Sequence, residues 1–190
     1  MKKINIIAEG GIMLALATAL SFIRIVQFPW GGAVTLISML PIMVFAIRHG
    51  VLKGLVVSFL FSLISFGQGI MIDGLLGWGL TPGLLVATIL LDYIFAFTVL
   101  AVSGIFGKTS LVRIIGGISL SVALRFVLHV FSGVFVFESV GLIWNWNIEN
   151  SWLYSMLYNA LFLVPELAMT LVGAVVMFEI PGVRKIMFNS

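Results

Sequence analysis

The stretch PGLLVATILLDYIFAFTVLAVSGIF, residues 82–106, decides the fold class, because it is predominantly apolar and holds one charged side chain, Asp92. A transmembrane α-helix needs about 20 consecutive, mostly apolar residues, so this stretch predicts a membrane span. Similar apolar segments lie before and after it, separated by polar, Gly-containing or Pro-containing breaks. The six predicted spans are 4–26, 35–47, 52–70, 82–106, 112–137 and 152–178.

The composition of the 190-residue chain agrees with an integral membrane protein, since 62% of the residues are hydrophobic, 9% are charged and the mean hydropathy is +1.25. Soluble domains contain about a quarter charged residues. At about 20 residues per crossing plus short loops, residues 1–190 form a single all-α domain of six transmembrane helices. The second span is short and contains Pro41, so we expect it to be tilted, broken or shifted.

Two further features of the composition exclude classes of site and partner. The chain has no cysteine, which excludes disulfides and thiolate metal sites. The net charge of +3 is small and the basic residues are scattered, which does not suggest binding to nucleic acid.

Basic residues are distributed unequally between the two sides of the predicted bundle. One side, which also holds both chain ends, carries eight of them, and the opposite side carries Arg24. The positive-inside rule therefore predicts that both termini are cytoplasmic. The eight residues are Lys2, Lys3, Arg48, Lys53, Lys108, Arg113, Arg184 and Lys185. All five tryptophans lie on the outer side, whereas an ordinary aromatic belt occupies both interfaces. They are Trp30, Trp78, Trp144, Trp146 and Trp152.

Polar side chains lie deep inside three of the predicted spans. Counting along the helices places them in one layer, roughly 10–18 Å below the outer surface. The layer consists of Asp92 and Tyr93 in the fourth span, Arg125 and His129 in the fifth and Asn159 in the sixth, with Tyr154 and Tyr158 at its entrance. Because polar groups in hydrocarbon by default mark a functional interior, the layer predicts a ligand pocket that opens outward.

Each of these residues also has a purely structural interpretation. Asp92 and Arg125 have similar depths and could form a structural ion pair. His129 could bind a carbonyl of another helix, and Asn159 could join two helices by a hydrogen bond. All of these residues lie at a similar depth and toward the outer side of the membrane, and this coincidence favours a binding site. Within it, we expect His129 to contact the ligand and Arg125 to form the floor, paired with Asp92.

A buried carboxylate surrounded by aromatic surface suits an organic cation. The amide, tyrosine and imidazole groups add donors and acceptors for a heterocycle. Catalysis is poorly supported, because hydrolase, metalloprotease and nucleotide-binding motifs are absent and no second carboxylate is clearly placed at the depth of Asp92. His49 and His129 lie at opposite ends of the bundle and cannot share a metal.

The first span carries a different pattern, GIMLALATA at residues 11–19, in which Gly11, Ala15 and Ala19 recur at every fourth position. Small residues at this spacing allow another helix to approach closely. The pattern predicts either an association face for a partner or packing inside the bundle.

Four stretches in register resemble the thiamine-specific substrate-binding (S) components of energy-coupling factor (ECF) transporters. They are PWGGAVTLISMLPI (29–42), LLDYIFAF (90–97), RFVLHVFSG (125–133) and WLYSMLYNA (152–160). Together with Ala15 and Ala19 they span nearly the whole chain. The resemblance implies a six-helix S-component fold in a bacterial plasma membrane, which binds thiamine from outside and has no cofactor besides this substrate. It also implies as partners a transmembrane coupling protein and two ATPase subunits, with Gly11, Ala15 and Ala19 on the docking face.

The resemblance further implies the ligand-binding residues. Family members use the matching positions of Asp92, His129, Asn159 and Tyr154 at the pocket, with Tyr93 beside the carboxylate and Trp30 and Phe137 as stacking aromatics. Some relatives carry Glu in place of Asp92 and tryptophan near Phe137, which leaves the carboxylate one methylene shorter here and the stacking role less certain. The alternatives are an S component for riboflavin or hydroxymethylpyrimidine, an intramembrane enzyme, or an assembly subunit without a ligand.

Overall fold

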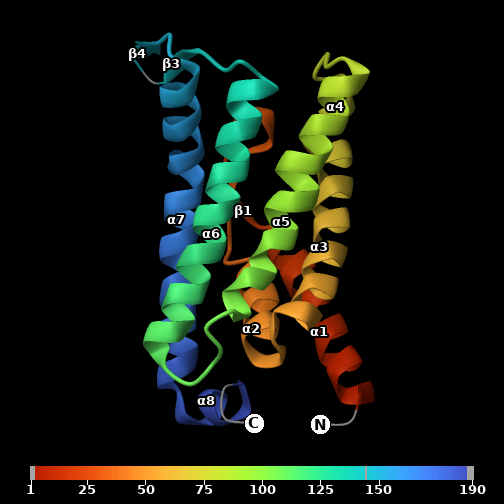
Figure 1. The fold of residues 1–190 in the computed structure, drawn as a ribbon, viewed down its shortest axis with the longest axis vertical. Coiled ribbons are helices and arrows are strands. Elements are labelled where there is room, and N and C mark those ends of the chain that lie inside the picture. Colours follow the sequence, from red (N-terminus) through yellow and green to blue (C-terminus); the bar gives the residue numbers. More distant parts are fainter. Residues whose placement is uncertain (1–2, 144, 188–190) are drawn as a thin grey trace.

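The computed structural model describes residues 3–143 and 145–187, and the predicted cation Lys2 and the tryptophan Trp144 lie outside them. Four helices in this part are long and apolar enough to cross a membrane (Figure 1). They are α3, the irregular helix Pro82–Gly104, α6 and α7. The long helices are α3 (Val51–Met71), α6 (Leu111–Phe135) and α7 (Ser151–Glu179). The helix Pro82–Gly104 is continuous but irregular and consists of α4 (Pro82–Thr88), the π-helical η3 (Ile89–Phe95), α5 (Ala96–Thr98) and the 3₁₀ segment η4 (Val99–Gly104). Shorter helices complete the fold, namely α1 (Lys3–Ser21), α2 (Leu40–His49), the 3₁₀ turn η2 (Leu75–Gly77) and α8 (Pro181–Met187).

Two of the spans, those that begin with α4 and with α7, start where the sequence offers capping residues. The side chain of Asn150 accepts the backbone N–H of Leu153 at 3.0 Å and caps α7. Thr81 precedes Pro82 at the first position of α4, where proline fits because it needs no N–H partner. These signals explain why the spans starting near residues 82 and 152 agree closely with the prediction.

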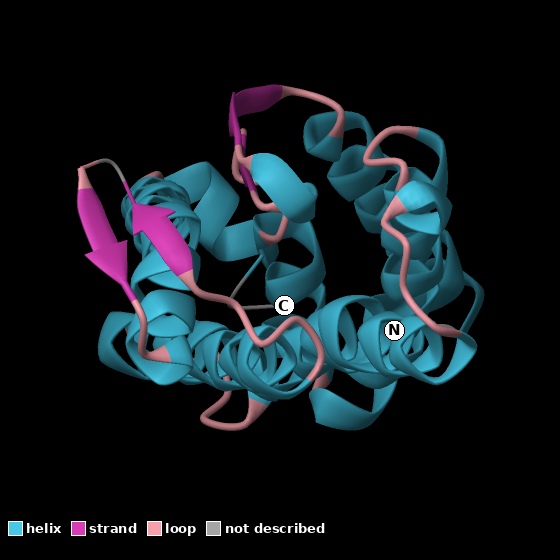
Figure 2. Cartoon of the chain, turned by 90° about the horizontal axis from the view of Figure 1, so that it is seen from above, coloured by secondary structure: helices cyan, strands magenta, loops and turns pink. Residues whose placement is uncertain are grey.

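The prediction that the chain is all-α is correct for the spans but wrong for two of the connections, each of which forms an antiparallel hairpin. The first hairpin joins β1 (Arg24–Gln27) to β2 (Ala33–Thr35) through the 3₁₀ turn η1 (Pro29–Gly31), and the second joins β3 (Gly141–Ile143) to β4 (Trp146–Ile148). The predicted first span, 4–26, therefore ends as a helix at Ser21. In the view along the helices, the two hairpins lie at separate places on the edge of the bundle (Figure 2).

The second predicted span, 35–47, is helical only in α2, which starts at Leu40 with Pro41 in its first turn. This short helix is the centre of the hydrophobic core, since every residue from Leu40 to Ile47 is buried. Two glycines let neighbouring backbones approach closely: a Cβ at Gly104 of η4 would overlap the carbonyl of Ala46 in α2, and a Cβ at Gly117 of α6 would overlap the carbonyl of Ser103 in η4.

The start of α1, the junction between α2 and α3, the loop before α6 and the helix α8 all lie at one end of the molecule (Figure 1). The β3–β4 hairpin and the start of α4 lie at the opposite end. The segments that carry the predicted inner cations therefore share one end. A polar cluster stands at that end, because Glu9 of α1 pairs with Arg48 at 2.9 Å and His49 at 3.1 Å.

Candidate functional site

The π-helical turn η3 places Asp92 and Tyr93 in the middle of the span Pro82–Gly104. Such turns insert an extra residue into a helix and recur at functional sites. The ring of Tyr93 packs edge-to-face on Phe66 at 5.9 Å and lies so close to Gly69 that a Cβ there would overlap its hydroxyl. Glycine at position 69 thus creates the space that Tyr93 fills.

Asp92 accepts hydrogen bonds from two residues of α6. The hydroxyl of Ser132 donates to Oδ2, and Nδ1 of His129 lies 2.8 Å from Oδ1. On the opposite side of the imidazole, Nε of Arg125 donates to Nε2 of His129 at 3.2 Å. Because an arginine Nε–H only donates, Nε2 accepts and the proton of the neutral ring resides on Nδ1, directed at Asp92.

The predicted contact between Arg125 and Asp92 is wrong, because His129 lies between them. The Arg125 guanidinium instead contacts the sulfur of Met39 at 2.6 Å and lies 4.2 Å from the centre of the Phe97 ring. The four-residue spacing places His129 one turn above Arg125, where its two ring nitrogens reach both groups. Arg125 is nevertheless buried and lines the same cavity as His129 and Asp92.

Asn159 is buried on α7, and its amide nitrogen donates to the carbonyl of Ser155 at 2.8 Å and to the Ser155 hydroxyl at 3.2 Å. Ser155 in turn donates to the carbonyl of Val130 at 3.1 Å, which joins α7 to α6. Within the described residues, no hydrogen bond engages the amide oxygen of Asn159. That oxygen remains an acceptor for a ligand.

Aromatic side chains form a rim at the outer end of the site. The rings of Trp30 and Trp78 meet edge-to-face at 5.8 Å, and Trp78 meets Phe137 at 6.0 Å. Tyr154 and Tyr158 stack in parallel on α7 at 6.3 Å. Trp30 lies in the hairpin turn with a positive φ of 62°, an uncommon conformation for a residue with a side chain.

The tryptophans predicted on the outer side divide into two groups. Trp30 and Trp78 line the cavity described below, whereas Trp152 packs on Phe131 and Phe135 outside it and Trp146 is 70% exposed. The first pair belongs to the site, and the second pair has the exposure expected of an interfacial belt.

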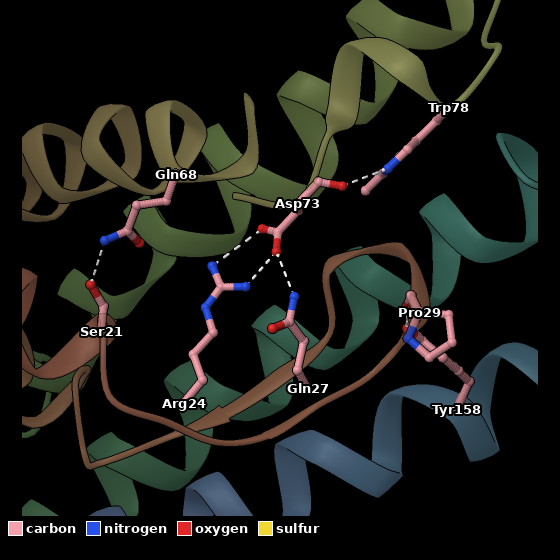
Figure 3. Close-up of polar contacts among 8 residues, drawn as sticks. All are labelled: Ser21, Arg24, Gln27, Pro29, Gln68, Asp73, Trp78 and Tyr158. Atoms are coloured by element: carbon pink, nitrogen blue, oxygen red, sulfur yellow. Dashed lines mark hydrogen bonds and ion pairs between the residues drawn. The ribbon is translucent and has the colours of Figure 1, made fainter. Parts of the chain in front are cut away.

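Polar contacts fix the β1–β2 hairpin over the site (Figure 3). Arg24 forms an ion pair with Asp73, and the amide of Gln27 donates to the same carboxylate at 3.3 Å. The hydroxyl of Tyr158 donates to the carbonyl of Pro29. The sequence placed Arg24 and Asp73 on the outer side but did not predict that they pair.

These groups surround a cavity of about 480 Å³, within the usual range for sites that bind small molecules. All seven predicted ligand residues line it: Trp30, Asp92, Tyr93, His129, Phe137, Tyr154 and Asn159. Among the described residues, no cluster of His, Asp and Glu is suited to hold a metal ion.

The expectation of a single buried carboxylate is wrong, because Glu166 also lines the cavity and is 2% exposed. Its Oε1 accepts the backbone N–H of Thr35 at 2.5 Å and the Thr35 hydroxyl at 2.6 Å. A periodic signal was available in the sequence, since Ser155, Asn159 and Glu166 recur on one face of the helix.

The small residues Gly11, Ala15 and Ala19 are exposed on α1, while Gly10 and Ala17 face the bundle and are buried. Apart from its chain neighbours and the nearby backbone of α1, no described residue has an atom within 4 Å of a Cβ built on Gly11. Of the two predicted interpretations, packing inside the bundle is therefore wrong, and the exposed face remains open to a partner.

Comparisons with known proteins identify the family and the fold. The sequence model of the family described as thiamine transporter protein (Thia_YuaJ) matches residues 7–185. Thiamine transporter ThiT of Bacillus subtilis (strain 168) is 30% identical over 179 residues, which cover 87% of this chain and 85% of that protein. The solved structure of ThiT from Listeria monocytogenes is 22% identical, covers 96% of this chain and 98% of that one, and superposes with a TM-score of 0.71, which establishes a common fold.

Proposed function

Because the chain belongs to the thiamine transporter protein family, we propose that it is the thiamine-binding S component of an ECF transporter. The resemblance found in the sequence motifs is confirmed at the level of the family, which consists of transporters and not of enzymes, as predicted. The chain is a multi-pass membrane protein. In the proposed role it captures thiamine from outside, and a transmembrane coupling protein with two ATPase subunits drives its delivery inward.

Residues 1–190 form one domain that crosses the membrane six times in this proposal. Beside the four long spans, α1 is 19 residues long and would extend about 28 Å. The short α2 supplies the sixth crossing together with β2, which precedes it along the chain. Six crossings return α8 to the side on which α1 begins, in agreement with the shared end of these helices in Figure 1. The positive-inside rule makes this side cytoplasmic.

The observation that carries the proposed ligand is the Asp92–His129 pair at 2.8 Å beneath an aromatic rim. Thiamine is an organic cation with a heterocycle that both donates and accepts hydrogen bonds. Asp92 supplies the negative charge, and the bonds from Ser132 and His129 hold its carboxylate in place. Asn159 presents its amide oxygen to the ligand from α7.

The aromatic residues Trp30, Tyr154 and Phe137 close over the heterocycle, and Tyr93 completes the wall beside Asp92. Trp30 is 61% exposed, and stacking on a ligand would bury part of this surface. Gly11, Ala15 and Ala19 supply the face on which the coupling protein docks, because they leave room for another helix to approach.

Tryptophan fluorescence tests the ligand, since Trp30 and Trp78 line the cavity and Trp146 does not. Titrating the purified protein with thiamine should change its emission and saturate at micromolar thiamine or below. The change should be largely lost in the double variant Trp30→Phe with Trp78→Phe and kept in the matched control Trp146→Phe. Riboflavin and hydroxymethylpyrimidine should compete poorly. No change with thiamine, together with a saturable change on riboflavin, would refute the assignment.

A further inference from the structure

The helix α1 contacts the rest of the bundle through a narrow face. Among its residues whose side chains the structure describes, the buried ones are Gly10, Ala17 and Ser21, and all three are small. The apolar side chain of Leu14 is partly buried against the core. By contrast, every residue of α2 from Leu40 to Ile47 is buried. The helix α1 therefore has little apolar packing to fix its position.

The apolar character of α1 does not by itself favour one face of the helix over another in a membrane. Lipid tails are as apolar as a protein core, so helix association depends on close packing and on directional polar contacts. A rotation of α1 about its own axis would exchange one apolar face for another. The polar contacts of α1 with its neighbours therefore decide which face it presents to the lipid.

Glu9 makes such contacts at the cytoplasmic end of α1. Its carboxylate lies 2.9 Å from Nη1 of Arg48 and 3.1 Å from Nε2 of His49, which are the last two residues of α2. The three side chains are 17%, 7% and 6% exposed, so salt and solvent screen the contacts little. Beside Glu9, Gly10 lets the ring of Phe45 approach, since a Cβ there would lie 3.3 Å from that ring. The start of α1 is therefore held against the end of α2.

A second polar contact holds the outer end of the same helix. The amide of Gln68 in α3 donates to the hydroxyl of Ser21 at 2.7 Å, and both residues are buried (Figure 3). Between the two contacts lies the exposed stripe of small residues that begins at Gly11. Each residue turns an α-helix by about 100°, so Gly11 lies about 200° around α1 from Glu9. Holding Glu9 against α2 therefore keeps Gly11 directed away from the bundle.

We propose that Glu9 is a positioning residue that sets the rotation of α1 through Arg48 and His49, and that this rotation presents the small residues of α1 to the coupling protein. The part that concerns the coupling protein rests on the proposed function, whereas the rotation of α1 does not. The competing account is that Glu9 only stabilises the bundle. In that case its removal would lower the unfolding temperature without turning α1.

The rotation can be measured in the purified protein, because the chain has no cysteine and one introduced cysteine carries a single spin label. Leu14→Cys places the label on the partly buried face, and Ala15→Cys places it on the exposed face. The two positions differ in depth by about 1.5 Å, so the oxygen gradient across a bilayer affects both labels alike. In lipid vesicles and with Glu9 intact, molecular oxygen should reach the label at position 15 more readily than the label at position 14.

Glu9→Gln keeps the shape of the side chain and removes its charge. The ratio of oxygen accessibility between positions 15 and 14 should fall toward one, while the thiamine affinity stays unchanged because Glu9 does not line the cavity. One interhelical polar contact in a membrane shifts such an equilibrium by about threefold to thirtyfold. Thiamine uptake in cells that contain the coupling module should therefore fall by about threefold or more.

The matched control is Glu179→Gln. Glu179 is an exposed carboxylate at the same end of the molecule and has no ion-pair partner among the described residues. Its removal should change neither the accessibility ratio nor uptake. The double variant Glu9→Arg with Arg48→Glu restores the pair with its charges exchanged and should recover both. Arg48→Gln removes the same contact from α2, should lower the ratio as well, and keeps the test decisive if Glu9→Gln does not fold.

Three outcomes separate the claims. A wild-type accessibility ratio in Glu9→Gln and in Arg48→Gln, with or without a lower unfolding temperature, would overturn the positioning role and support the competing account. A changed ratio with undiminished uptake would overturn the presentation of α1 to the coupling protein. Failure of the wild-type protein to bind thiamine would instead contradict the proposed function and leave the measured rotation of α1 standing.

Discussion

Breaking the ion pair between Arg24 and Asp73 should loosen the β1–β2 hairpin and speed the release of bound thiamine. The hairpin carries Trp30 over the cavity, and Asp73 holds it from the end of α3 (Figure 3). Arg24→Met keeps much of the apolar stem but removes both guanidinium contacts. Asp73 is then left with the bond from Gln27 as its remaining contact to the hairpin.

The free energy lost when the Arg24–Asp73 ion pair is broken should lie between two limits. Removing one partner of a fully buried pair costs about 3–5 kcal/mol, whereas exposed pairs contribute about 0.2–1 kcal/mol. The side chains of Arg24 and Asp73 are 13% and 5% exposed, and Gln27 still binds the carboxylate. We therefore expect Arg24→Met to weaken thiamine binding by about 2 kcal/mol. Because changes in affinity appear mostly in the dissociation rate, this corresponds to a roughly thirtyfold faster release.

The assay loads the purified protein with labelled thiamine and follows its release during a chase with unlabelled thiamine. It compares the wild type with Arg24→Met, Asp73→Asn and the double variant. Because the double variant leaves no unpaired charge, it should release thiamine more slowly than the two single effects combined predict. Release at the wild-type rate in both single variants, or simple additivity in the double variant, would refute the role of the pair.

Other substitutions test the remaining parts of the account. Tyr158→Phe removes the hydrogen bond to the carbonyl of Pro29 and should speed thiamine release by about fivefold, corresponding to about 1 kcal/mol; an unchanged rate contradicts this. Gly69→Ala displaces the Tyr93 ring, so calorimetry should show both a lower unfolding midpoint and weaker binding, at a cost of about 1–3 kcal/mol. Ala15→Leu should leave thiamine affinity unchanged but reduce uptake in cells that contain the coupling module, and undiminished uptake would exclude this docking face.

Much of the site could be predicted because a polar residue inside an apolar membrane span by default marks a functional site. Asp92, His129 and Asn159 fall at one depth when residues are counted along their helices, and the structure places all three at one cavity. Counting residues along a helix gives the depth of a side chain in the membrane. It does not give the direction in which the side chain points around the helix axis. This is why Arg125 was assigned to Asp92, although His129 occupies the space between them.

The hairpins could not be predicted from apolar character, since short apolar runs fit strands as well as helices. The run through Ile25 and Val26 continues the hydrophobicity of α1, yet the helix ends at Ser21 and both residues lie in β1, where Val26 pairs with Val34 of β2. Glu166 was not predicted as a site residue, and it lies seven residues deeper along its span than Asn159. Glu166 is buried on the same face of α7 as Asn159, and a helical repeat of about 3.6 residues counted along the sequence predicts this shared face.

The most direct test of the central claim, that this chain binds thiamine through Asp92, is equilibrium dialysis of wild-type protein and Asp92→Asn against labelled thiamine. The substitution preserves the shape of the side chain and removes its charge. For charges about 5 Å apart at an effective dielectric constant of about 20, the loss is about 3 kcal/mol, or roughly a hundredfold in affinity. The account predicts saturable binding of one thiamine per wild-type chain and binding weakened by about that factor in Asp92→Asn. Equal affinities for the two proteins, or no binding by the wild type, would contradict it.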